Sequence, residues 1–280
     1  GNDELFGGRG DDRLFGGAGD DRLLGGAGDD LMVANGIGNI QNGDAGNDVM
    51  VGLGKANIQH GGAGDDILVA VGKGNLQMGS SGSDIIVGLG KGNVQFAGDL
   101  LDLVPEELEI DGKTQDDLGT HVTETAAGVE RNVLVAAGKG NLQVGDLGRD
   151  IAIGLGETNV QKLGAGNDVG IAPAKKASFQ FGESGKDVLV NMQFTKNGGT
   201  FQSGGGDDDT MITFFGGANS KPMGVQMGNS GNDIMAMISQ DFFKELTTGS
   251  KPASGSTSGS KSGGVTFQSG GSGDDTFLDL

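Results

Sequence analysis

Residues 62–79 read GAGDDILVAVGKGNLQMG, and residues 43–60 read GDAGNDVMVGLGKANIQH, which is nearly the same sequence. Each stretch contains two unlike halves. One half has an aspartate at its Gly-rich turn, Asp48 or Asp66, and the other has an asparagine, Asn57 or Asn75. Close self-similarity at a fixed short period is typical of a solenoid, in which each repeat is one structural unit. These residues therefore predict a repeat fold built from eighteen-residue units.

The same pattern extends in both directions along the chain. Towards the N-terminus it becomes three tandem nonapeptides between Gly7 and Val33, which read GGRGDDRLF, GGAGDDRLL and GGAGDDLMV. Short apolar runs between Gly-rich turns every nine residues indicate short strands. We therefore expect an all-β fold, a parallel β-roll (β-solenoid) of about twelve 18-residue coils with two insertions. Each coil would contain two strands and two turns, and coils would stack at about 4.8 Å.

Two segments interrupt the period and define the expected organisation. We expect a β-roll over 1–98, an acidic insertion over 99–129 and a continued roll over 130–238. A Gly/Ser-rich linker or loop over 239–264 and a terminal repeat over 265–280 complete the chain. A helix could start at Pro105, and another turn of helix could lie in QDFFKEL. The separation from glutamine to the next aspartate is almost always seven residues, whereas the return path grows from 11 to 35. One turn is thus held fixed while the opposite side accepts insertions.

Composition excludes several function classes. The chain has 59 glycines among 280 residues, no cysteine and a net charge of -19. That charge argues against nucleic acid and against anionic membrane surfaces as partners. No apolar run is long enough for a membrane span, and no disulfide can form. No nucleophile, base and orienting group come together, so we expect no enzyme activity. The chain starts inside a repeat without Met, and we interpret it as a segment of a larger protein.

Stacking places residues eighteen apart next to one another. Asp30, Asp48 and Asp66 would then form a column along one edge, where like charges about 5 Å apart repel by roughly 1 to 3 kcal/mol. Calcium suits such a column because it accepts six to eight oxygen ligands with loose geometry and takes backbone carbonyls readily. Magnesium prefers a strict octahedron, and zinc prefers Cys or His. The column therefore predicts multiple calcium ions.

The nonapeptides between Gly7 and Val33 resemble the RTX (repeats-in-toxin) family, whose calcium-loaded form is a parallel β-roll. The later units, with their G-K-G-N-φ-Q halves, look like the C-terminal repeats of multifunctional autoprocessing RTX toxins. The resemblance implies that each ion is shared by turn aspartates of successive coils and by carbonyls of the Gly-x-Gly turn. The implied aspartate ligands are Asp12, Asp30, Asp48, Asp66, Asp84, Asp150, Asp168, Asp187, Asp209, Asp233 and Asp275, with Asp21 on the opposite edge. The implied carbonyl ligands are those of Gly10, Gly28, Gly46, Gly64, Gly82, Gly148 and Gly166.

The opposite edge departs from this pattern. After Asp3 and Asp21 its turn residue becomes asparagine, and Lys73 stands two residues before Asn75. An asparagine can cap its own turn through its amide, and a neighbouring lysine supplies positive charge without a metal. We therefore expect calcium along the aspartate edge and little or none along the asparagine edge. The alternative, in which asparagine is a weaker ligand and both edges load, stays open.

The glutamines recur with the same period and should stack into an amide ladder. We expect β-branched pairs such as Ile67 and Val69 inside the roll and the glutamines outside. Phe179, Phe201 and Phe267 are expected to enlarge the core of the later coils. We expect the glutamine side chains to point outward because the β-branched residues are the most apolar ones available for the core.

The resemblance implies a calcium-binding module of a large bacterial toxin that folds on calcium binding after export. It also implies type I secretion and a secreted, extracellular location. Calcium is scarce in the cytosol, so a chain that needs it would stay unfolded until export. Two alternatives remain: a structural or adhesive rod in contact with a host-cell surface, and an accessory module of a secreted enzyme.

Overall fold

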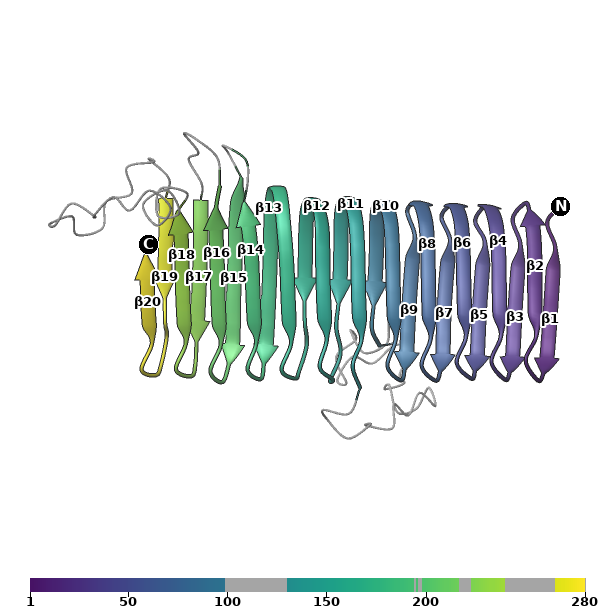
Figure 1. The fold of residues 1–280 in the computed structure, drawn as a ribbon, viewed down its shortest axis with the longest axis horizontal. Helices are drawn as coiled ribbons and strands as arrows, with labels where there is room; N and C mark the ends of the chain where they lie inside the picture. The colour runs from purple at the N-terminus through teal and green to yellow at the C-terminus, as the bar shows by residue number, and fades with distance from the viewer. Residues whose placement is uncertain (99–129, 194, 196–197, 217–222, 240–264, 280) are drawn as a thin grey trace, which may run out of the picture.

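The protein is described by a computed structural model that covers residues 1–98, 130–193, 195, 198–216, 223–239 and 265–279 (Figure 1). These residues form twenty parallel strands and contain no α-helix. Within them, no helical segment is long and apolar enough to cross a membrane. The strands are β1 Glu4–Arg9, β2 Arg13–Ala18, β3 Arg22–Ala27, β4 Leu31–Ile37, β5 Ile40–Ala45, β6 Val49–Lys55, β7 Ile58–Ala63, β8 Ile67–Lys73, β9 Leu76–Ser81, β10 Ile85–Phe96, β11 Val133–Val144, β12 Ile151–Lys162, β13 Val169–Ser184, β14 Val188–Gln193, β15 Gly199–Gly206, β16 Thr210–Phe215, β17 Met223–Asn229, β18 Ile234–Ser239, β19 Val265–Ser269 and β20 Thr276–Asp279.

Successive strands alternate between two parallel sheets, so the chain winds into a β-solenoid. Early strands pair eighteen residues apart, as in Ile67 with Ile85 and Leu76 with Val94. One sheet, here the aliphatic sheet, holds the even-numbered strands from β2 to β8, the first halves of β10 to β13, and β14, β16, β18 and β20. The other, here the glutamine sheet, holds β1, β3, β5, β7, β9, the second halves of β10 to β13, and β15, β17 and β19. The expected parallel β-roll is confirmed, with about ten turns where we expected about twelve.

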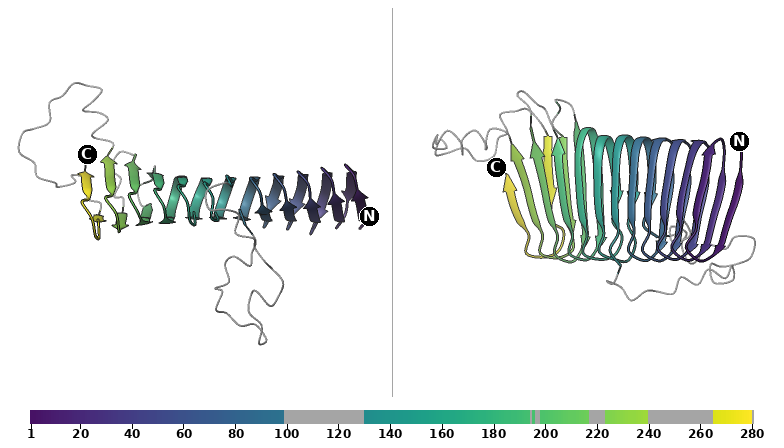
Figure 2. Two further views of the ribbon diagram at one scale, coloured as in Figure 1. Left: turned by 90° about the horizontal axis from the view of Figure 1, so that it is seen from below. Right: turned by 45° about the vertical axis from the view of Figure 1, so that its right-hand side comes forward.

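Two edges join the sheets. At the Asp edge the chain passes from the glutamine sheet to the aliphatic sheet through turns that end on aspartate; at the Asn edge it returns. Figures 1 and 2 show the coils in a straight row with all Asp-edge turns on one side. Register is kept across the interruptions: Gln202 pairs with Gln226 and Gln226 with Gln268. The extra residues before β15, β17 and β19 therefore enter at the Asn edge, as the variable Asp-to-Gln spacing indicates.

Each sheet contributes a single layer of inward side chains to the core. On the aliphatic sheet the inward positions include Met32, Met50 and Leu68, which stack on one another and are all fully buried. At one coil this position is Gly170, and the Cδ1 of Leu163 would lie 3.2 Å from a Cβ added there. Leu163 is fully buried and clusters with Leu189. A large side chain from the turn thus fills the space that the glycine leaves, which keeps the interior close-packed.

The expected orientation of the later strands is wrong. Ile67 is 39% exposed, whereas Gln59 and Gln77 are fully buried. The two-residue period of a strand explains the inversion: Asp66 points inward, so Leu68 also points inward and Ile67 points out. The buried glutamines are satisfied, since Gln77 Nε2 donates to Gln59 Oε1 (2.8 Å) and to the Leu68 carbonyl of the other sheet (3.1 Å). The expected amide ladder exists, but it runs inside the roll and bridges its sheets.

The expected role of the late phenylalanines is also wrong. Phe179 is 42% exposed and Phe267 54% exposed, because both stand one residue before an inward glutamine and therefore point outward. Phe201 is half-buried, with its ring centroid 5.4 Å from that of Phe181. The acidic insertion over 99–129, including the helix expected at Pro105, lies outside the described residues. So does the linker over 239–264 except for Ser239, which ends β18.

Candidate metal centre

The turns of the Asp edge are built from glycines in conformations that other residues rarely adopt. In the turn from Gly61 to Asp66, Gly62 has φ 113° and Gly64 has φ 132°. A Cβ on Gly64 would also collide with the Gly46 carbonyl of the preceding coil. Glycine accommodates such φ values together with this close approach of main chains. The first position of Gly-x-Gly also accepts Asp44 and Ser80, both with positive φ, so the glycine is most consistently kept at the position of Gly64.

The turn aspartates form a hydrogen-bonded column. The backbone N–H of Asp48 donates to Asp66 Oδ1 (2.7 Å), and that of Asp66 donates to Asp84 Oδ1 (2.9 Å). The same bond recurs through the stack up to the N–H of Asp233, which donates to Asp275 Oδ1 (3.1 Å). The structure thus brings together all eleven Asp-edge residues expected from the sequence. Nine of them are buried, while Asp12 and Asp275 at the ends are half-buried.

The second oxygen of these carboxylates has no protein partner. Oδ2 is buried and without a hydrogen bond in most of the column. A buried unpaired carboxylate oxygen is costly, and a repeated one indicates a missing partner with positive charge. Asp150 is different, because its Oδ2 accepts the N–H of Asp146 (2.8 Å). The residues with an unpaired Oδ2 are Asp12, Asp21, Asp30, Asp48, Asp66, Asp84, Asp168, Asp187, Asp209 and Asp233.

Most of the unpaired oxygens lie over the first glycine of their own turn, while at Asp168 this position is Leu163. A Cβ added to Gly61 would collide with Asp66 Oδ2 and would lie 2.6 Å from the Gly79 carbonyl oxygen of the next coil. A Cβ on Gly25 would meet Asp30 Oδ2 and, at 3.0 Å, the Gly43 carbonyl oxygen. A side-chain oxygen and a main-chain oxygen from successive coils therefore converge on the same space. Our sequence reasoning missed this glycine, the first of each Gly-Gly pair, although the doublet itself was the signal.

Burial gives these carboxyl groups unusual proton affinities. Loss of solvent, reinforced by repulsion from neighbouring aspartates, raises the pKa of Asp66 to about 7 and that of Asp84 to about 8. The same causes raise the pKa of Asp187 to about 8. Hydrogen bonds from the preceding coil's N–H oppose the shift without cancelling it. Without a cation, the column therefore favours protonated carboxyl groups near neutral pH.

The donor set fits calcium. In the described part of the chain, no three His, Cys, Asp or Glu side chains converge as a metal site. The carboxylates instead follow one another singly, coil by coil, with main-chain carbonyls between them. Calcium takes such mixed carboxylate and carbonyl oxygen sets. The Gly-x-Gly carbonyls expected from the resemblance lie in these turns: Gly10, Gly28, Gly46, Gly64, Gly82 and Gly166 all have positive φ, and only Gly148 does not.

The Asn edge is built differently, because most of its amides pair with one another; the buried Oδ1 of Asn141 is an exception. Asn57 Nδ2 donates to Asn75 Oδ1 and Asn75 Nδ2 to Asn93 Oδ1, both at 3.1 Å. Asn93 Nδ2 donates to the Gly88 carbonyl (3.0 Å) of its own turn. These buried amides carry no charge and need no cation. The change from Asp66 to Asn75 every nine residues thus separates an edge with unpaired carboxylate oxygens from a neutral, hydrogen-bonded edge.

The first coils are an exception on that edge. Asp21 is 1% exposed, accepts the N–H of Asp3 through Oδ1 (3.0 Å) and leaves Oδ2 unpaired. A Cβ on Gly16 would contact Asp21 Oδ2 at 2.5 Å, which repeats the arrangement of the Asp edge. The N-terminal end of the roll therefore has this arrangement on both edges.

One coil of the Asp edge lacks every element of the turn. Asn132 takes the place of aspartate, Ala97 that of the first glycine and Glu130 that of the Gly-x-Gly glycine. Asn132 Oδ1 accepts the N–H of Asp84 (2.7 Å), so its buried, unpaired Nδ2 occupies the position of the unpaired carboxylate oxygen. An amide N–H group cannot ligate a cation. The column of oxygens is therefore interrupted between Asp84 and Asp150.

This interruption yields a prediction. The double variant Ala97→Gly/Asn132→Asp restores the missing oxygen and the space above the glycine, so bound calcium should rise by about one ion per chain. Calcium content after equilibrium dialysis, measured by elemental analysis, checks it. Ala97→Gly alone is the control and should leave the content unchanged. An unchanged content in the double variant would contradict the assignment of the interruption.

Comparison with known proteins agrees with the site. The RTX calcium-binding nonapeptide repeat (4 copies) matches residues 1–32 and 42–70. No curated protein and no solved structure matches the chain. The matched residues contain the Asp-edge turns of Asp12, Asp30, Asp48 and Asp66, and RTX nonapeptide repeats bind multiple calcium ions.

Proposed function

The chain carries RTX calcium-binding repeats, and we propose that it is a calcium-dependent folding module in which ions load along the Asp edge on both sides of Asn132. The ligands would be the Oδ2 atoms of the column aspartates and main-chain carbonyls of the Gly-rich turns. Calcium supplies the positive charge that the column lacks. The chain's own residues fix the spacing of the oxygens and exclude water from them. The module itself performs no catalysis.

One observation carries this proposal. The structure buries one carboxylate per coil and leaves its Oδ2 without a hydrogen bond, coil after coil. A fold that did not use a cation would pair these oxygens, as the Asn edge pairs its amides. Coupling between metal and fold follows, because the column forms only when the coils stack.

The role in export is a further part of the proposal. We propose that the chain belongs to a bacterial protein secreted unfolded by a type I apparatus, and that calcium outside the cell drives its folding. The net charge of -19 supports this, since such a chain repels itself without cations. A toxin would be the parent protein. Refolding rates measured across cytosolic and extracellular calcium concentrations test this part.

Asp66→Asn tests the ligand assignment. Asparagine keeps the Oδ1 acceptor for the Asp48 N–H and removes only the charged second oxygen. We expect the loss of one or two bound ions and at least a roughly tenfold higher calcium concentration at the folding midpoint. Isothermal titration calorimetry and calcium-dependent circular dichroism measure these quantities.

Asn75→Asp is the matched control in the same coil. It places a carboxylate on the Asn edge, where the asparagine side chains already pair with one another and Lys73, two residues earlier, supplies positive charge. Calcium content should therefore not rise. If Asp66→Asn keeps the full number of ions, or if Asn75→Asp gains one, the division of labour between the two edges is wrong.

A further inference from the structure

The outer surface of the aliphatic sheet is apolar over seven consecutive coils. Between the turns, β6, β8 and β10 to β14 each present three outward side chains, and every one of these is aliphatic, proline or methionine. Many are substantially exposed. Leu53, Ile67, Val71, Ile85, Leu89 and Leu155 are each between 37% and 45% exposed. This surface, defined by those seven strands, is here called the aliphatic face.

The opposite surface has only one continuous apolar row. On the glutamine sheet the outward position before each glutamine is apolar, as at Ile58 and Phe179, whereas the position after it is mixed and includes Asn42, His60 and Lys162. Both sheets build the same core and carry the same strand register, so folding of the roll does not require one outer surface to be apolar. The asymmetry indicates a function for the aliphatic face beyond the fold.

Its size matches a protein interface. Seven strands at about 4.8 Å and three outward positions per strand cover roughly 600 to 700 Å² in projection. Apolar patches on monomeric proteins rarely exceed about 300 to 600 Å². A standard interface buries about 800 Å² on each partner. The aliphatic face is therefore large for a surface in water and close to what one stable contact needs.

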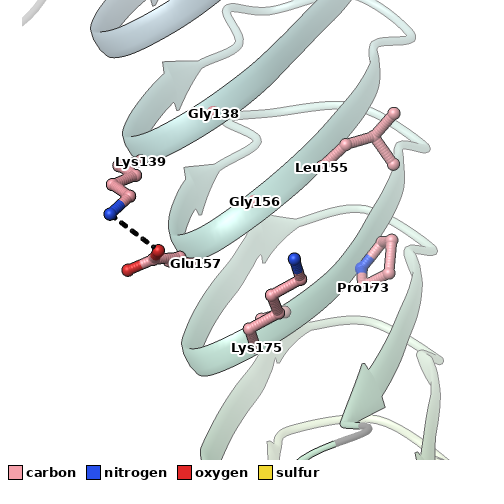
Figure 3. A pocket seen from close by; sticks show the side chains of 8 residues that line it. Gly138, Lys139, Leu155, Gly156, Glu157, Pro173 and Lys175 are labelled. Carbon is pink, nitrogen blue, oxygen red and sulfur yellow. Dashed lines mark ion pairs between the residues drawn. The ribbon is translucent and has the colours of Figure 1, made fainter.

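Charged rows border the aliphatic face. Lys55, Lys73, Lys91 and Lys139 lie in register along its Asn-edge side. Figure 3 shows where this row meets Glu157, whose carboxylate lies 3.0 Å from Lys139, beside the face residues Leu155 and Pro173. Lys176 Nζ also lies 2.7 Å from this carboxylate. The Asp-edge side of these seven strands carries a mixed row that includes Asp65 but also the exposed Arg131, Arg149 and Lys186.

We propose that the aliphatic face is a self-association surface that binds the same face of a second copy of this chain. A partner that packs closely must match rows of side chains repeating at the coil spacing, and a second copy does so by construction. Two sheets packed face to face interdigitate their side chains in this way. A two-fold axis along the solenoid would bring the lysine row of each copy towards the mixed row of the other, whereas an axis along the strands would stack lysine on lysine.

Bound calcium favours this association because it lowers the net negative charge of each copy. Two metal-free copies would each bring a net charge of -19 to the contact. Ions held at the Asp edge reduce that repulsion and also form the flat face. Association therefore follows folding. A chain that folds with calcium but remains monomeric would refute the proposed self-association without contradicting the proposed calcium-dependent folding module.

The experiment compares two matched double variants in calcium by sedimentation velocity and light scattering. Val87→Lys/Val135→Lys places two charges at neighbouring positions on the aliphatic face. Val94→Lys/Leu142→Lys places two at equally paired positions of the same strands on the glutamine sheet. We expect a dimer for the wild-type chain and for the second variant. The first variant should dissociate with a dimer Kd at least about tenfold higher and an unchanged circular dichroism spectrum.

A second variant, Val87→Thr/Val135→Thr, keeps β-branched side chains and is used if the lysine variant on the aliphatic face fails to fold. It should also weaken the dimer. A monomeric wild-type chain at high micromolar concentration in calcium would overturn the proposal. Equal dissociation of both lysine variants would overturn it too. Binding of a monomeric chain to phosphatidylcholine vesicles would replace the second copy with a lipid surface.

Discussion

Removing calcium with excess EGTA at neutral pH is expected to abolish most of the β-sheet circular dichroism of this chain and to expand it to the size of an unfolded polymer. The column of buried carboxylates is the reason. Most coils bring an aspartate next to that of the next coil, and except at Asp150 the buried Oδ2 has no protein donor. Without a cation, stacking must either hold unpaired charges out of water or protonate them. Restoring millimolar calcium should restore the β signal.

The pKa values give the pH dependence of this effect. Burial raises the pKa of Asp66 from 3.8 to about 7 and that of Asp84 to about 8. A raised folded-state pKa means that the metal-free fold takes up protons. Its stability contribution is fully present below the unfolded value and is lost as pH rises through 7 to 8. The chelated chain should therefore be least folded at the alkaline end of the neutral range.

Magnesium at the same ionic strength is the control. It retains its waters and requires a strict octahedron, so it should not rescue the chelated chain at millimolar concentration. Equal rescue by magnesium would show that general screening of charge, rather than ion binding between coils, drives folding. A chelated sample that keeps its circular dichroism and its size at neutral pH would remove the calcium requirement.

The sequence predicted the winding because the repeat period determines it. An eighteen-residue period with glycines at fixed offsets allows residues such as Asp48, Asp66 and Asp84 to stack, and the structure stacks them. The metal column followed from that stacking and from Coulomb repulsion alone. Neither inference required knowing which side of a strand faces inward.

Orientation was the part that hydrophobicity could not decide. A run such as Ile67–Val71 is apolar on both sides of the strand, so its alternation carries no signal. The polar residues next to the run determine its orientation instead. Asp66 sits one residue before the run and must point into the turn, and the two-residue period then places Leu68 and Ala70 inside. Gln77 is buried for the same reason, and its hydrogen bonds across the roll replace hydrophobic packing.

The aliphatic face could have been found by the same reasoning. Once Leu68 and Ala70 are assigned to the core, the apolar residues Ile67, Val69 and Val71 have no place except the surface. An apolar run on an outward register is a signal for a partner. The sequence contained this signal, but the expectation that the most β-branched residues fill the core concealed it.

The second large effect is expected from Gly64→Ala, which should destabilise the calcium-loaded roll by at least about 3 kcal/mol. Gly64 has φ 132°, a conformation that an L-residue adopts only with strain, and a Cβ there would collide with the Gly46 carbonyl. The colliding atom is main chain on a stacked coil, so it cannot rotate away. The coils must separate, which also pulls apart the oxygens around Asp66. Calcium-dependent folding should therefore shift to higher calcium and lower temperature.

Gly74→Ala is the control within the same coil. Gly74 also has a positive φ, 68°, but nothing lies within 4 Å of a Cβ added there. The equivalent position one coil earlier is Ala56, which adopts φ 53° in the native chain. The cost of Gly74→Ala should be limited to left-handed strain of about 1 kcal/mol. If thermal unfolding in calcium shows equal losses for both variants, backbone conformation alone limits stability. A much larger loss at Gly64 means that close stacking of the metal-binding turns holds the roll together.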